Sequence, residues 1–359
     1  MRWKRSLPIL LVVLAVAAAL VAVVQLRRRA PPEAARLLPG ADAFFYVNLK
    51  WLRTLKAIGE LPPVTHDPEY ERFIQLTGFQ FERDLDEAAF AIHYPHSRTV
   101  AGRPEEFRFS EVLVGKINRD RLSTYLHQLA SVVEGYHATD IFNIPMEGRT
   151  VRVAVLSVDS VAVSNVDDPS VIRGMIDRSH KLASPFGGPA LLRQYYKTLP
   201  VVSKTLPLLK LAWFIGRIDP AAASLGGWSM LLQKPVSLVV AAYYPLLAPG
   251  LRLRAEAFSE TAADAQALTE RVSTFLSLFH AAEMSVATKG TDPDVKALFD
   301  SLNVEQHGDR AILTASIPTG FLRKAVAEPQ ELAPPATAPP QSGATPAPQP
   351  SPPPPKQAK

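Results

Sequence analysis

Apolar and polar residues alternate along several short segments of this chain, which is the pattern of a β-strand with one face in water. The clearest case is residues 251–258, where Leu251, Leu253, Ala255 and Ala257 alternate with charged residues. Runs of apolar, β-branched and aromatic residues also favour strands. We predict further strands at residues 43–49, 88–94, 107–116, 211–218 and 236–244, and hairpins at 151–156 with 161–164 and at 304–306 with 311–317.

Segments with a helical period of 3.6 residues lie between the predicted strands. Helix starts are indicated where a capping carboxylate precedes proline, at Asp67-Pro68, Asp168-Pro169 and Asp292-Pro293. Asn118 is expected to cap another helix, and Thr261 with Asp264 resembles a capping box. The helix after Asn118 is predicted to have an apolar face of Leu122, Tyr125, Leu126, Leu129 and Val133, and the helix after Thr261 one of Leu268, Val272, Phe275, Leu276 and Phe279.

The order of predicted elements begins again near residue 210. The run at residues 88–94 ends in Tyr94-Pro95, and the run at 236–244 ends in Tyr244-Pro245. We therefore predict an α+β fold in which two similar modules, residues 41–185 and 186–327, each have a mainly antiparallel sheet with helices on one face. The alternative is one irregular α+β domain whose element order repeats by chance.

An apolar segment from Leu7 to Leu26 carries no charged residue and is flanked by basic residues. About 20 residues at ~1.5 Å each are enough for the ~30 Å core of a bilayer. We predict that residues 1–29 form an uncleaved signal-anchor helix, followed by a linker at residues 30–40. A cleaved signal peptide is the alternative, although the apolar run is long for one and ends in three arginines without a convincing cleavage site.

Basic residues on both sides of this segment leave the positive-inside rule without a clear answer. Because the short N-terminus carries several cations, we expect it to stay in the cytoplasm. The protein would then be a single-pass protein of the cytoplasmic (inner) membrane, with an extracytoplasmic domain in the periplasm. Residues 328–359 are rich in proline and alanine, and we expect them to be disordered. This tail could be a spacer, a docking strip or simply a solvated end.

Composition excludes several kinds of chemistry. The chain has 359 residues, of which 47% are hydrophobic and 20% charged, so it can form a sizeable core. It has no cysteine, which rules out disulfides, thiolate metal ligands and cysteine nucleophiles. The net charge of +5 is concentrated around the apolar N-terminal segment. The rest is close to neutral, and we expect no nucleic-acid partner.

No nucleotide, metalloprotease or cysteine metal motif occurs, so we expect no catalytic, cofactor-binding or metal residues. Three residues are the best remaining candidates. Asp84 and Asp86 could act as a general acid and base, although turn and cap roles explain them as well. Ser229 lies in a segment that approaches a nucleophile elbow, but Leu231 stands where the second glycine is required. His93 and His96 are too isolated to predict a metal site.

Aromatic residues are concentrated in the second half of the chain, where they could line a groove for an apolar ligand or form a core. They are Tyr195, Tyr196, Trp213, Phe214, Trp228, Tyr243 and Tyr244.

The segment from Leu38 to Leu49, LPGADAFFYVNL, and the later Thr77-Gly78-Phe79 motif resemble uncharacterised membrane-anchored bacterial proteins of unknown function. The resemblance implies an N-terminal anchor and a repeated α+β ectodomain, and it implies no activity. We therefore expect a non-enzymatic binding or scaffold protein of the envelope, whose partner is an envelope protein or an apolar ligand. The alternatives are an envelope hydrolase or transferase, and a structural tether that uses the tail.

Overall fold

The computed structural model describes most of the chain between the two ends. The described residues are 30–54, 66–95, 106–182, 188–200, 208–220, 231–245, 250–286 and 292–326. The predicted anchor from Leu7 to Leu26, the candidate Ser229 and the tail at residues 328–359 lie outside these ranges. Among the helices of the described ranges, none is both long enough and apolar enough to cross a membrane.

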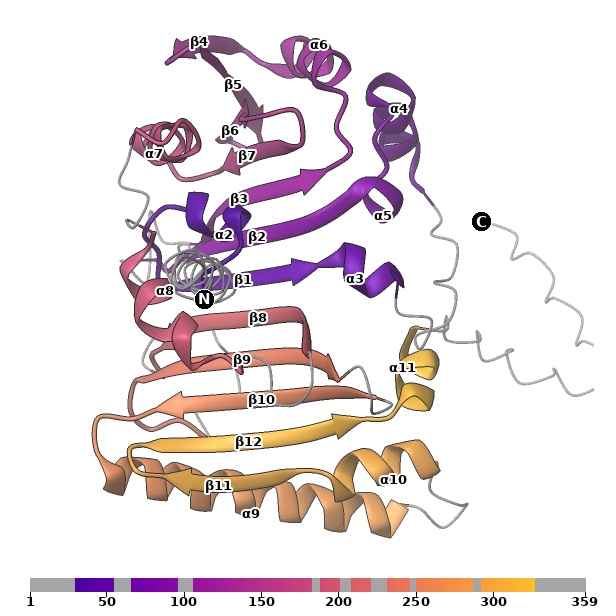
Figure 1. Cartoon of the computed structure of the whole chain (residues 1–359), viewed down its shortest axis with the longest axis vertical. Helices are drawn as coiled ribbons and strands as arrows, with labels where there is room; N and C mark the ends of the chain where they lie inside the picture. Colours follow the sequence, from indigo (N-terminus) through magenta and orange to yellow (C-terminus); the bar gives the residue numbers. More distant parts are fainter. Residues whose placement is uncertain are drawn as a thin grey trace, which may run out of the picture.

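In the described ranges, the strands form one continuous antiparallel sheet of 12 strands (Figure 1). This confirms the predicted α+β class with mainly antiparallel pairing. From one edge to the other, the strands are β11 (Asn303–His307), β12 (Arg310–Ile317), β10 (Leu251–Phe258), β9 (Val236–Pro245), β8 (Leu208–Ile218), β1 (Ala43–Asn48), β2 (Leu85–His93), β3 (Arg108–Gly115), β7 (Ser160–Ser164), β6 (Arg149–Val155), β5 (Thr139–Met146) and β4 (Val132–Tyr136).

Strands β1 and β8 pair near the centre of the sheet, although about 160 residues separate them in sequence. Their antiparallel register aligns Ala43 with Gly216 and Val47 with Ala212. Outward from this pair, β2, β3, β7 and β6 follow on one side, and β9, β10, β12 and β11 follow on the other. The same order of strand, strand, strand and hairpin therefore extends in both directions, and β4 and β5 are added at one end.

Helices cover both faces of the sheet, so the prediction of helices on one face is wrong. Neighbouring residues of β6 show this, because successive side chains of a strand point to opposite faces. Ala154 belongs to a core cluster with Ile172 of α7 (Ser170–Ser179), whereas Val153 and Val155 pack with Leu126 of α6 (Arg119–Leu129). Both faces of these strands are apolar, and each needs a helix to exclude water.

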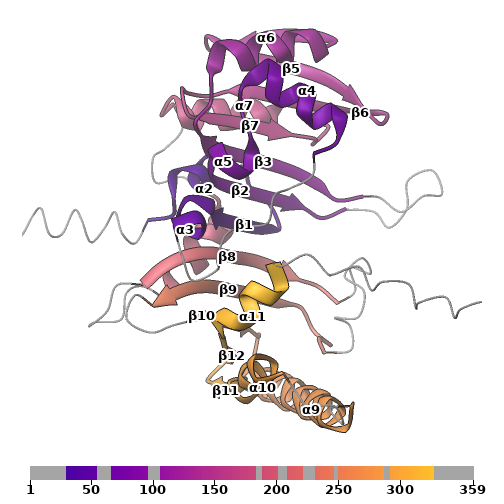
Figure 2. The same ribbon diagram turned by 90° about the vertical axis from the view of Figure 1, so that its right-hand side faces the viewer.

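We call the two sides the front face and the back face. The front face, which includes Phe44 and Tyr46, is covered by α2 (Glu33–Leu37), α7, α8 (Ala190–Tyr195) and the short 3-10 helix η2 (Tyr196–Thr198). The back face, which includes Val47 and Phe214, is covered at one end by α4 (Pro68–Thr77), α5 (Phe81–Asp84) and α6. At its other end it is covered by α9 (Ala262–Val286), which projects from the lower end of the sheet in Figure 2.

The remaining helices lie next to strand ends. They are α3 (Leu49–Thr54) after β1, α10 (Pro293–Asp300) before β11, and α11 (Thr319–Val326) after β12. The largest core cluster takes residues from both halves of the chain: Tyr46, Ala89 and Ile176 from the first, and Trp213 and Val239 from the second.

The predicted helix caps are present except before α7, where Pro169 and not Asp168 occupies the N-cap position and no side chain forms a cap hydrogen bond. Asp67 accepts a hydrogen bond from the backbone nitrogen of Tyr70 at 2.8 Å, and Asn118 accepts one from Arg121 at 3.1 Å. Before α9, the hydroxyl of Thr261 accepts from the backbone nitrogen of Asp264 at 3.1 Å. These side chains satisfy backbone donors that have no partner inside the helix.

The β4–β5 hairpin is not among the predicted elements. Val133 was expected on the apolar face of the helix after Asn118, but α6 ends at Leu129 and Val133 lies in β4. Two adjacent β-branched residues, Val132 and Val133, favour the extended strand, and Gly135 disfavours a helix interior.

Candidate functional site: an apolar groove under the long helix

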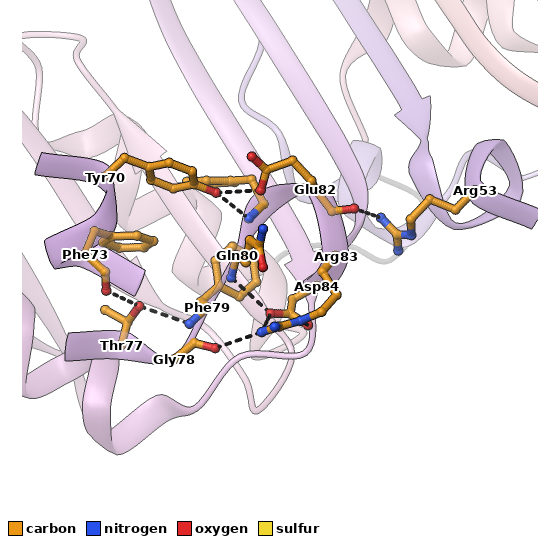
Figure 3. Close-up of polar contacts among 11 residues, drawn as sticks. Arg53, Tyr70, Phe73, Thr77, Gly78, Phe79, Gln80, Glu82, Arg83 and Asp84 are labelled. Atoms are coloured by element: carbon orange, nitrogen blue, oxygen red, sulfur yellow. Dashed lines mark hydrogen bonds and ion pairs between the residues drawn. The ribbon is translucent and has the colours of Figure 1, made fainter. Parts of the chain in front are cut away.

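Asp84 has a structural role at the junction of α5 and β2 (Figure 3). Its carboxylate accepts a hydrogen bond from the backbone nitrogen of Gln80 at 3.0 Å. It also accepts two from Arg83, at 2.9 and 2.7 Å. The hydrogen-bonded guanidinium of Arg83 lowers the pKa of Asp84, which is 6% exposed. A carboxylate held in its charged form by a neighbouring arginine is a poor general acid.

Asp86 pairs with a different arginine. Its Oδ1 lies 2.6 Å from Nη2 of Arg53, and Nη1 of Arg53 also donates to the carbonyl oxygen of Leu85 at 2.5 Å. Arg53 therefore ties the end of α3 to the start of β2. Asp84 and Asp86 thus bind separate partners and do not form a paired acid and base. Their contacts fit the turn and cap roles that the sequence also allowed.

A polar network beside Asp84 holds α4 and α5 together. Glu82 accepts a hydrogen bond from the hydroxyl of Tyr70 at 2.8 Å and lies 3.0 Å from Nε2 of His66. The other ring nitrogen of His66 lies 2.7 Å from Glu71. The pKa of His66 is raised, chiefly by the hydrogen bond to Glu71; desolvation opposes this effect, and the hydrogen bond to Glu82 adds to it. In the described ranges, no group of three or more metal-ligating side chains could hold an ion.

The feature with the clearest binding geometry is a groove between α9 and the back face of β9, β10 and β12. Its volume is about 350 Å³. The sheet contributes side chains such as Val240, Leu253 and Leu313, and the helix contributes Leu268 and Val272. Every described residue that lines the groove is apolar. This volume falls within the range of roughly 300–1,000 Å³ that is typical of small-molecule sites.

The groove exists because α9 packs tightly at its N-terminal end and less tightly farther along. Along α9, the exposed fraction of the residues that face the sheet increases from 0% at Ala265 and 6% at Leu268 to 45% at Phe275. The sheet side of the groove includes small or slender side chains, notably Ala255 on β10 and Val304 on β11. The helix and the sheet therefore do not fill the space between them.

The aromatic residues singled out in the sequence do not form this groove. Tyr196 and Trp213 are buried in the central core, at 4% and 2% exposed, and Trp228 lies outside the described residues. Tyr195 lines a separate cavity of about 390 Å³ between α8 and the ends of β8–β10, where polar residues such as Arg217 and Asp309 also contribute. The apolar groove is lined by aliphatic side chains together with the ring of Phe275.

The sequence carried a partial signal for the groove. Leu268, Val272, Phe275 and Leu276 were recognised as one apolar helix face, and the alternation of residues 251–258 placed Leu253 and Ala255 on one face of a strand. The pattern identifies which faces are apolar. It does not tell whether two apolar faces meet in full contact or leave a cavity between them.

Comparisons with known proteins assign no family to the chain. No protein-family model matches it, and no curated protein matches it. Two solved structures, crystal forms IV and I of TP0453, are similar with a TM-score of 0.39 and 10% sequence identity. The match covers 83% of this chain and 98% and 97% of the respective TP0453 chains.

Proposed function

We propose that this protein is a non-enzymatic binding protein of the bacterial envelope, and that it holds an apolar ligand in the groove between α9 and the sheet. The observation that carries the proposal is the groove itself, a space of about 350 Å³ lined by apolar side chains alone. Exposed apolar surface of this kind is stabilised when a hydrocarbon replaces the water in it, at roughly 25 cal/mol per Å² buried.

The same lining argues against a catalytic role for the groove. General acid–base or nucleophilic chemistry requires a titratable or nucleophilic group within hydrogen-bond distance of the reacting atoms. Among the described residues that line the groove, none carries such a group. The proposed role is therefore to bind a ligand and shield it from water.

The proposed location follows from the sequence. The uncharged segment from Leu7 to Leu26 would anchor the protein in the cytoplasmic membrane, and the α+β domain would lie on the periplasmic side. A groove on an anchored domain would stay close to a membrane, which is a natural source of apolar molecules.

We also propose that the two halves of the chain are related by internal duplication. The support is the repeated strand order on the two sides of the central β1–β8 pair. In this arrangement α9 corresponds to α6, because each follows the third strand of its half. The second half has no counterpart of the β4–β5 hairpin in its described residues, and its helix is 25 residues long against 11 for α6.

The proposal can be tested by photo-crosslinking in the full-length chain, reconstituted in phosphatidylcholine vesicles. The probe is decanoate that carries a diazirine on its chain, and the attachment sites are mapped by peptide mass spectrometry. We expect cross-links on α9, β9 and β10, with saturation as the probe concentration rises. The variant Ala255→Phe places a ring inside the groove and should remove these cross-links, because the apolar space is then filled.

Ala263→Phe is the matched control, since Ala263 lies exposed on α9 and does not line the groove. It should keep the cross-links of the unmodified protein. Thermal unfolding of Ala255→Phe verifies that the variant folds. Unsaturable labelling spread over the surface, or labelling that Ala255→Phe leaves unchanged, would show that the groove does not bind the acyl chain of the probe.

A further inference from the structure

We propose that the ligand is a single-chain amphiphile with an anionic head group, and that Arg271 binds this head group at the edge of the groove. The inference rests on the proposed function and specifies its ligand class. The acyl chain would lie between α9 and the sheet, and the carboxylate of a fatty acid would meet the guanidinium of Arg271.

The position of Arg271 supports this assignment. It lies on α9 between Leu268 and Phe275, both of which line the apolar groove. Arg271 itself lines a small adjoining cavity of about 50 Å³. The two cavities share walls, including Leu231, Leu232 and Leu268, so the cation is next to the end of the apolar surface.

The charge of Arg271 is available for a ligand. Its Nη2 donates to the amide oxygen of Gln233 at 2.6 Å, and among the described residues no carboxylate forms an ion pair with it. The acidic residues around the small cavity are associated with the neighbouring lysine instead. Asp264 lies 2.7 Å from Nζ of Lys234, and that hydrogen bond raises the pKa of Lys234, with a further contribution from Glu260.

A guanidinium that is paired only with a neutral amide keeps donors for a second partner. Arginine presents five N–H groups in a planar fork, and this fork matches the two oxygens of a carboxylate. The guanidinium of Arg271 is therefore complementary to an anion, whereas the described residues that line the groove itself are apolar. Only an amphiphile satisfies both parts of this surface.

The dimensions favour one chain of moderate length. The helix residues that line the groove extend from Leu268 to Leu276, about 12 Å along the axis at ~1.5 Å per residue. The volume of about 350 Å³ is near the lower limit of roughly 300 Å³ for small-molecule sites. A medium-chain acid such as decanoate suits this space better than a phospholipid with two chains.

The test compares decanoate with decanol as unlabelled competitors of the photo-crosslinking probe, in the full-length chain in phosphatidylcholine vesicles. We expect decanoate to compete more strongly than decanol in the unmodified protein. Arg271→Gln should weaken competition by decanoate about tenfold, equivalent to about 1.4 kcal/mol, and leave decanol unchanged. Arg119→Gln on α6 is the matched control, because Arg119 is exposed and lies on a different helix.

The outcomes separate this inference from the proposed function. Equal competition by acid and alcohol in the unmodified protein, unaffected by Arg271→Gln, would overturn the anionic head group and retain an apolar site. If Arg271→Gln abolished competition by both decanoate and decanol without changing the unfolding temperature, the proposed head-group contact would also be overturned. If a diazirine-labelled phosphatidylcholine labelled the groove saturably and decanoate did not reduce that labelling, the ligand would be a two-chain bilayer lipid and not a single-chain amphiphile. If the unmodified protein bound none of these acyl-chain probes, the proposed function itself would be wrong.

Discussion

The ring of Tyr46 stacks on the ring of Trp213 across the central β1–β8 pair, with 5.5 Å between ring centroids and 16° between ring planes. The ring of Tyr196 meets Trp213 edge-on, at 5.5 Å and 77°. Trp213 is 2% exposed, so nearly all of its surface is buried. Desolvation raises the pKa of Tyr46, which keeps its hydroxyl neutral. This aromatic stack joins the two halves of the sheet.

Replacing Trp213 should therefore destabilise the whole domain. Trp213→Ala is expected to lower the free energy of unfolding by about 3–5 kcal/mol, because it removes a large buried ring and leaves a cavity. Urea unfolding of residues 30–327, followed by circular dichroism, measures the change. Trp51→Ala is the control, since Trp51 is 44% exposed, and it should change stability by no more than about 0.5 kcal/mol. Two separate transitions in the Trp213→Ala variant would contradict a single cooperative core.

Gly115 should tolerate no side chain. A Cβ atom at this position would lie against the backbone oxygen of Asp84, well inside van der Waals contact, and a backbone atom cannot move aside as a flexible side chain can. We expect Gly115→Ala to cost about 1–3 kcal/mol of stability, the usual range for overpacking. Gly135→Ala provides the comparison, because Gly135 is also in a strand but has open space around its Cα. Equal stability of the two variants in urea would exclude the predicted clash.

His66 should make the stability of the domain depend on pH. Its pKa in the folded protein is raised above the ordinary value of 6.5, chiefly by the hydrogen bond to Glu71. A raised folded-state pKa means that the stabilisation is fully present below pH 6.5 and is lost as pH rises through the folded-state value. The stability difference between the unmodified protein and His66→Gln should therefore shrink from mildly acidic to alkaline pH. A difference that grows with pH would refute the assigned direction.

Asp84 should be important for folding and not for ligand binding. Asp84→Ala leaves the backbone nitrogen of Gln80 and the side chain of Arg83 without their acceptor, which should cost about 1–3 kcal/mol. Because the pKa of Asp84 is lowered, chiefly by Arg83, its stabilisation should be present above pH 3.8 and be lost as pH falls through the folded-state pKa. Competition by decanoate should be unchanged at a temperature where the variant is folded. Weaker competition there would assign Asp84 a role in binding.

Local features of the fold follow closely from the sequence. The caps at Asp67, Asn118 and Asp292 and the alternation of residues 251–258 correspond to observed helix starts and to β10. These patterns depend on neighbours within one or two turns or along one strand, so they can be recognised without knowing the tertiary contacts. The β4–β5 hairpin was not predicted because Val133 also fits the apolar face of the preceding helix. The β-branched pair Val132-Val133 favours the strand, and the pairing of Val133 with Phe142 adds tertiary support that the local pattern lacks.

The sequence by itself determined the absence of cysteine chemistry, the α+β class, the apolar segment from Leu7 to Leu26 and the apolar faces of strands and helices. The tertiary structure decided which of these faces meet. It placed β1 against β8, put helices on both faces of one sheet, and left a groove between α9 and the strands that carry Ala255 and Val304. The physical reason is that hydrophobic burial is non-directional: an apolar pattern requires cover, and only chain connectivity and side-chain volume determine which partner supplies it and how much space remains.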